Sequence, residues 1–112
     1  MLTVEAIKAL GANTDEGIAR CMGNEGFYLR MVNLALDDKG YDALKKAVDE
    51  GDIKAGFEAA HALKGVLANL ALTPLLEPAG KASDLMKAGS MEGCAELTDR
   101  LLEEREKFRA LL

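Results

Sequence analysis

The stretch that decides the fold runs from residue 52 to residue 71 and reads DIKAGFEAAHALKGVLANLA. Asp52 can cap a helix, because its carboxylate can accept hydrogen bonds from the first free backbone amides. Gly51, just before it, interrupts any helix that arrives from upstream. The stretch contains no proline, so we expect one continuous helix of about five turns from Asp52 to Ala71.

The apolar residues of this helix are spaced so that they gather on one side. At about 100° per residue, the positions opposite His61 form a stripe that we expect to pack in the core: Ala59, Leu63, Val66 and Leu70, flanked by Gly56 and Leu67. The positions within about 60° of His61 are Phe57, Lys64, Gly65 and Ala68. The imidazole is therefore predicted to face away from the core.

The residues that follow this histidine give the sharpest chemical signal in the chain, HALKG at 61–65. A glycine inside a helix costs about 1 kcal/mol relative to alanine, and Gly65 beside an outward histidine suggests clearance for something large. Lys64 suggests that the visiting group is anionic. An exposed imidazole is largely neutral at about pH 7, so a ring nitrogen is free to act as a nucleophile. Together these features favour a histidine that accepts a phosphoryl group.

The run from His61 to Gly65, followed by VLANL at 66–70, resembles the histidine-containing phosphotransfer (HPt) domain of bacterial two-component phosphorelays. The resemblance implies that His61 accepts a phosphoryl group from a receiver-domain aspartate, on Nε2 by the family pattern, and passes it to another receiver. Lys64 would hold the phosphoryl oxygens, and Gly65 would leave space for the receiver. Ala68 and Phe57 share this face and are candidate docking residues. Phe57 has a second interpretation, which we favour, as a residue at the edge of the core.

The sequence departs from the family pattern at two positions. Family members often have a small polar residue where Val66 stands and a glycine where Ala71 stands. Neither departure touches the proposed chemistry. No carboxylate cluster accompanies the histidine, so we expect no metal site and no cofactor in this chain, and the receiver would hold any Mg²⁺.

Length and composition indicate one domain that spans residues 1–112 and is large enough to bury a core. The chain has no tryptophan and only two prolines, and it has no alternating β-branched runs, which favours an all-α fold. A net charge of −5 argues against nucleic acid or an anionic membrane surface as the main partner. Without a leader or a long apolar segment, the protein is expected in the cytoplasm. Cys21 and Cys94 are expected to be reduced, partly buried thiols.

The rest of the chain is predicted to form helices joined by short turns, at 3–10, 15–22, 24–36, 41–50, 74–88 and 91–111. In the segment 24–36, we expect Phe27, Met31, Leu34 and Leu36 to lie on the apolar side. Pro78 is expected to make the first turn of its helix irregular. Because short turns make consecutive helices antiparallel, the expected fold is all-α, an up-and-down antiparallel four-helix bundle with short accessory N-terminal helices.

Several functions compete for this pattern. The resemblance implies a phosphocarrier rather than a multiple-turnover enzyme, expected to be monomeric, with response-regulator receiver domains and a hybrid sensor histidine kinase as partners. The alternative is a non-phosphorylated helical adaptor that binds a signalling partner through the same face. A kinase dimerisation domain is disfavoured because Ala62 stands where an acidic residue normally follows the histidine, and no ATP-binding region follows. A metal-binding or catalytic protein ranks third. The initiating Met and the absence of a linker favour a free-standing protein.

Overall fold

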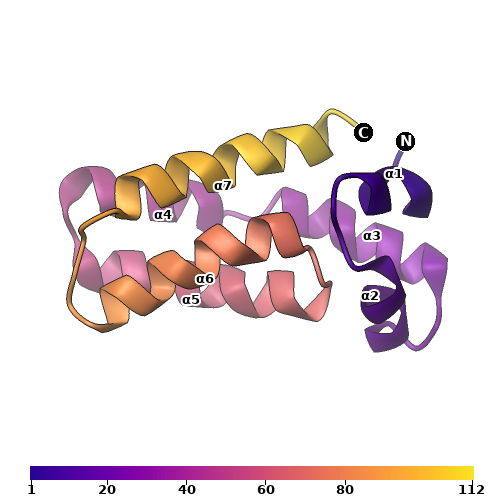
Figure 1. Cartoon of the computed structure of the whole chain (residues 1–112), viewed down its shortest axis with the longest axis horizontal. Coiled ribbons are helices and arrows are strands. Elements are labelled where there is room, and N and C mark those ends of the chain that lie inside the picture. Colours follow the sequence, from indigo (N-terminus) through magenta and orange to yellow (C-terminus); the bar gives the residue numbers. More distant parts are fainter.

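The computed structural model describes residues 1–112 and contains helices but no strands, which confirms the all-α class. Figure 1 shows the seven helices in chain order: α1 (Val4–Ala9), α2 (Thr14–Arg20), α3 (Glu25–Leu36), α4 (Gly40–Glu50), α5 (Ile53–Asn69), α6 (Thr73–Lys87) and α7 (Cys94–Arg109). None of them combines the length and the apolar character that crossing a membrane requires.

Helix α5 begins and ends as local sequence chemistry dictates. Asp52 caps it, because its Oδ1 accepts a hydrogen bond from the Ala55 amide at 3.1 Å. Gly51 ends α4 with φ at +70°, a left-handed conformation that glycine adopts without steric cost. The continuous helix is confirmed, although it ends at Asn69 and Ala71 takes a left-handed φ of +54° in the turn that follows.

Helices α4 to α7 pack side by side, each against two of the others. Helix α5 contacts both α4 and α6, α6 contacts α7, and α7 contacts α4. Turns of a few residues join them, so neighbours run in alternating directions along the long axis, as Figure 1 shows. Large, fully buried side chains fill the space between these helices: Tyr41, Leu44, Leu63, Leu67, Leu75, Leu101 and Phe108. Burial of this apolar surface is the main force that holds the helices together.

Arg105 on α7 fastens the junction between α3 and α4. Its Nε donates to the Leu36 carbonyl at 2.8 Å, and its guanidinium lies 4.2 Å from the centre of the Tyr41 ring. This cation–π contact and the hydrogen bond hold the end of α3 and the start of α4 against the same side chain. The break between the two helices is therefore fixed in place.

Helices α1 and α2 lie together with α3 at one end of the molecule (Figure 1). Two hydrogen bonds attach this end to the turn that follows α5: the Asn13 amide donates to the Ala71 carbonyl at 2.9 Å, and the Tyr28 hydroxyl donates to the Leu70 carbonyl at 3.0 Å. The second bond is buried. The N-terminal helices are therefore tied directly to the end of α5.

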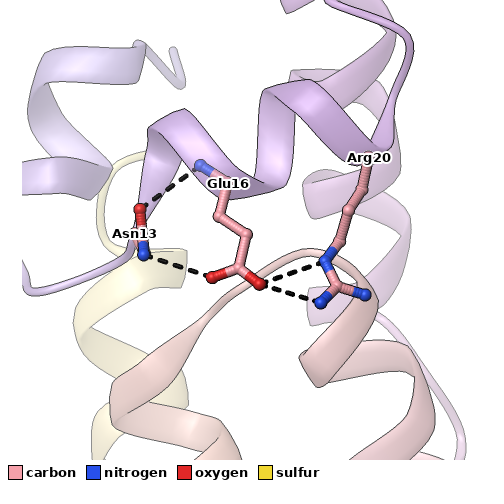
Figure 2. A network of polar contacts seen from close by, with 3 residues as sticks. All are labelled: Asn13, Glu16 and Arg20. Atoms are coloured by element: carbon pink, nitrogen blue, oxygen red, sulfur yellow. Dashed lines mark hydrogen bonds and ion pairs between the residues drawn. The ribbon is translucent and has the colours of Figure 1, made fainter.

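A polar network orders the short helix α2 (Figure 2). Asn13 caps the helix by accepting from the Glu16 amide at 3.3 Å, and its own amide group donates to Glu16 Oε2 at 3.2 Å. Arg20, one turn later, donates to Glu16 Oε1 from Nη2 at 2.8 Å and from Nε at 3.3 Å. A reciprocal cap of this kind stabilises a helix that is too short to form alone.

The predicted core face of α3 is wrong for two of its four residues. Phe27 is 42% exposed and Leu34 is 61% exposed, whereas Met31 is partly buried against the core and Leu36 is buried as expected. The side chains that α3 buries are instead Tyr28, Val32, Ala35 and Leu36. The helix is therefore rotated so that an apolar stripe remains at the surface.

Two further predictions about local structure need correction. Val66, placed in the core stripe of α5, is 37% exposed, and Ala60 is buried in that stripe together with Gly56, Leu63 and Leu67. Helix α6 continues through Pro78 without the expected irregular turn. The ring removes only one helical hydrogen bond, near the helix start, and Pro78 is itself buried in the packed structure.

Candidate functional site

His61 lies in the middle of α5, on the side that faces away from the core. The residue is exposed, while Ala60 and Leu63 on either side are fully buried or nearly so. This confirms the outward placement predicted from helical spacing. An exposed imidazole on a rigid, well-capped helix presents its ring nitrogens to a visiting molecule without any need for the chain to open.

Phe57, one turn before His61, stacks against the imidazole. The two ring centroids are 5.3 Å apart and the ring planes differ by 24°. Phe57 is partly buried and packs against the core, in agreement with the favoured interpretation of this residue. Sequence spacing placed both side chains on one face, but it did not predict the stack. The contact restricts the orientation of the imidazole.

Lys64, one turn after His61 in the same helix, pairs with a carboxylate on α6. Its Nζ lies 3.7 Å from Asp84 Oδ1. Both side chains are well exposed, at 42% for Lys64 and 73% for Asp84, so the pair contributes at most about 1 kcal/mol. A pair this weak leaves the ammonium free to move toward an anion bound at the imidazole. Asp84 is not among the residues that the sequence predicts for this site, because it belongs to a different helix.

Gly65 leaves an open surface one turn beyond the imidazole. It is exposed, and a Cβ atom built on it would meet no atom within 4 Å. Ala68, a further turn along, is partly buried and small. Packing within the chain therefore gives no reason for a glycine at this position. No other side chain of the protein fills the space above Gly65.

Neither a metal-binding cluster nor an exposed thiol accompanies this imidazole. No three or more His, Cys, Asp or Glu side chains are grouped so that they could hold a metal ion. Cys21 and Cys94 are free and buried, and burial raises the pKa of the Cys94 thiol, which keeps it protonated. This surface therefore presents one exposed imidazole, one ammonium weakly paired with Asp84 and one exposed glycine.

Comparison with known proteins shows the family to which the chain belongs. The family described as Hpt domain matches residues 38–111, which is more than half of the chain. The chain belongs to the Hpt domain family. Hpt domains take part in histidine phosphotransfer in phosphorelays, are phosphocarrier modules rather than typical enzymes, and interact with receiver domains and kinases. No match was found among curated proteins or among solved structures.

The Hpt match begins at residue 38, immediately after α3. It therefore includes α4 to α7 with His61, Lys64 and Gly65, and it leaves out the helices α1, α2 and α3. The resemblance noted in the sequence is confirmed by this match. The N-terminal third of the chain has to be understood from its own residues.

Proposed function

We propose that this Hpt domain accepts a phosphoryl group on His61 from the aspartate of a receiver domain and passes it to a second receiver. The observation that carries the proposal is the exposed imidazole of His61 beside a glycine that nothing in the chain requires. A receiver needs close access to this ring, and the lack of a side chain at Gly65 leaves room for it.

The transfer needs no group that this chain lacks. In the neutral imidazole one nitrogen carries the proton and the other, Nε2 in this proposal, attacks phosphorus with its lone pair. The N–P bond forms as the bond between phosphorus and the aspartyl oxygen breaks, and the aspartate leaves as a free carboxylate. Passing the group to a second receiver reverses these steps.

Two side chains assist this step in the proposal. Phe57 keeps the imidazole ring in a narrow range of orientations, so that the attacking nitrogen points toward the receiver. Lys64 exchanges the Asp84 carboxylate for the phosphoryl oxygens as negative charge arrives, because the existing ion pair is weak. Ala68 lies further along the same helix and would be covered by the docked receiver.

The finer architecture belongs to the same proposal. Helices α4 to α7 would form an up-and-down antiparallel four-helix bundle that holds α5 rigid, with α1 to α3 packed at one end. We place the protein in the cytoplasm as a monomer, because receivers and the kinase domains that feed them act there. A hybrid sensor histidine kinase would supply the phosphoryl group through its receiver.

The test is phosphoryl transfer from a panel of purified, phosphorylated receiver domains to the wild-type protein and to His61→Gln. We expect an acid-labile, base-stable label on the wild type and background label on the variant. Because His61 is exposed, the free energy of unfolding of the variant should differ from that of the wild type by no more than about 0.5 kcal/mol. Label that persists in His61→Gln would assign the chemistry to another residue. A wild type that folds normally and accepts no label from a broad panel would favour the adaptor function.

A further inference from the structure

The side chain of Lys64 lies against α6. Its Cε and Cδ atoms are 3.9 and 4.0 Å from the place where a Cβ would stand on Gly80, and its Nζ is 3.7 Å from Asp84 Oδ1. Gly80 and Asp84 are four residues apart, so they occupy the same face of α6 on consecutive turns. The glycine and the carboxylate together therefore set the direction in which Lys64 points.

This direction leads back toward the turn of α5 that carries His61. Helix α6 runs back along α5 after the turn at residues 70–72, as Figure 1 shows, so the step from Gly80 to Asp84 is a step toward the start of α5. Long side chains in a helix lean the same way, toward its N-terminus. Because Lys64 follows His61 by three residues, its ammonium lies on the His61 side of its own Cα.

Asp84 has lysines on its own helix but pairs with Lys64 across helices. Lys81 and Lys87 stand three residues before and after it on α6, at a spacing where ion pairs can form. Lys81 pairs instead with Glu77 at 3.8 Å, and no ion pair joins Lys87 to Asp84. The single ion-pair partner of Asp84 is thus the lysine that stands beside His61.

A carboxylate in this place affects phosphorylated His61 in two ways of the same sign. It competes with the phosphoryl oxygens for the Lys64 ammonium, and it adds negative charge near a group that is itself negative. The competition is the larger effect, because the ammonium and the carboxylate are in contact while the repulsion acts at longer range through solvent. Both effects raise the free energy of phospho-His61 relative to the unphosphorylated site, where the ion pair is intact.

We propose that Asp84 is a positioning residue that keeps the phosphoryl group on His61 transferable. This inference rests on the proposed phosphotransfer function. A carrier has to give up the group that it accepts, and a Lys64 with no other partner would hold the phosphoryl oxygens more tightly. Asp84 draws the ammonium back as the group leaves. It thereby shifts the equilibrium between phospho-aspartate plus His61 and aspartate plus phospho-His61 toward the receiver.

The test measures this equilibrium in the wild type, Asp84→Asn and Asp99→Asn. Each protein is mixed with a receiver that labels the wild type, and the label on both partners is quantified at a plateau approached from phosphorylated receiver and from phosphorylated Hpt domain. We expect Asp84→Asn to shift the equilibrium toward phospho-His61 by about two- to fivefold, the range open to an exposed ion pair. Asp99 is the matched control, because its side chain is 64% exposed and pairs loosely, at 4.0 Å, with Lys45 on α4. Asp99→Asn should behave as the wild type.

Further variants identify the route of the effect. Asp84→Glu keeps the charge and should restore the wild-type equilibrium. In a Lys64→Gln background, Asp84→Asn should shift the equilibrium much less, because no ammonium is left to compete for. An equally large shift in that background would show that the carboxylate acts directly on the phosphoryl group, and would overturn the positioning role. Asp84 is 73% exposed, so its variants should fold as the wild type does by circular dichroism, and Asp84→Ala provides a second uncharged variant.

The outcomes separate this inference from the function on which it rests. An unchanged equilibrium in Asp84→Asn and Asp84→Ala, with normal labelling of His61, would overturn the role of Asp84 and leave phosphotransfer intact. The same shift in Asp99→Asn would assign the effect to net charge, and would also overturn the proposal. Failure of the wild type to accept label from any receiver would overturn both.

Discussion

Two glycines inside helices, Gly17 in α2 and Gly65 in α5, have opposite surroundings. A glycine at such a position costs about 1 kcal/mol relative to alanine, so each needs a physical reason. A Cβ at Gly17 would lie 2.6 Å from the Leu70 carbonyl oxygen and would also meet the Tyr28 ring. A Cβ at Gly65 would meet nothing within 4 Å. The first glycine is explained by packing within the chain, and the second is not.

This difference separates the two regions by role. The N-terminal helices need close contact with the end of α5, where Gly17 lets the Tyr28 ring and the Leu70 carbonyl approach. The outward face of α5, in contrast, has no other part of the chain packed against it at Gly65. A costly glycine without a neighbour is thus a stronger indication of an external partner than a glycine that its own fold explains.

The largest effect on stability is expected from Gly17→Ala. The added methyl group must displace the Tyr28 ring or the Leu70 carbonyl, and overpacking of this kind costs about 1 to 3 kcal/mol. Urea unfolding followed by circular dichroism measures the loss. The matched control is Gly26→Ala in α3, where the nearest atom to an added Cβ is Asn24 Oδ1 at 3.6 Å, so no loss is expected. If Gly17→Ala were as stable as the wild type, packing within the chain would no longer explain Gly17, and the contrast with Gly65 would be lost.

The next effect is expected from Tyr28→Phe, which removes the buried hydrogen bond between α3 and the Leu70 carbonyl. Leaving a buried acceptor unpaired should cost about 1 to 2 kcal/mol. The ring itself remains, so the core keeps its volume. Thermal unfolding at neutral pH measures the change. If the N-terminal helices are attached chiefly by other contacts, the variant and the wild type will have the same midpoint temperature of unfolding.

The same hydroxyl predicts a dependence on alkaline pH. Burial, with a smaller contribution from Cys21, raises the pKa of Tyr28 to about 12 from its ordinary 10.0. Because the folded state favours the protonated phenol, its contribution to stability is complete below pH 10.0 and is lost as pH rises toward about 12. Unfolding free energies measured across this interval should fall more steeply for the wild type than for Tyr28→Phe. Parallel curves would show that ionisation of this phenol does not limit stability there.

The sequence was sufficient to predict α5 because the information is local. Asp52 and Gly51 set the start, no proline interrupts the run, and the apolar spacing places His61 outward. The stack of Phe57 on His61 follows the same spacing of four residues. The ion pair between Lys64 and Asp84 could not be predicted, since it depends on how α6 lies against α5.

The buried face of α3 could not be predicted because the helix carries two apolar stripes. Phe27, Met31 and Leu34 repeat at the same spacing as Tyr28, Val32 and Ala35, one residue or about 100° apart. Periodicity indicates that either stripe can be buried, and only tertiary contacts choose between them. The Tyr28 hydroxyl donates a hydrogen bond to the Leu70 carbonyl, which favours burial of its stripe and leaves Phe27 and Leu34 of the other stripe exposed.

The turn after α5 explains one departure from the family pattern. Ala71 has φ at +54°, in the left-handed region where glycine is at ease and alanine is strained. The glycine that family members often have at this position suits that conformation directly. The sequence shows alanine in place of glycine at residue 71, but it does not predict the positive φ of that residue.

The smallest effect on stability, and the one of opposite sign, is expected from Gly65→Ala. The methyl group enters open space, and alanine is the better helix former, so the variant should gain up to about 1 kcal/mol in the free energy of unfolding. The same methyl group stands on the face that the receiver must approach, so the rate of transfer to His61 at subsaturating receiver should fall several-fold. Only clearance for a partner makes one change both stabilise the fold and slow the transfer. A variant that gains stability and transfers at the wild-type rate would contradict this role, and Gly65 would then be no more than a tolerated defect in the helix.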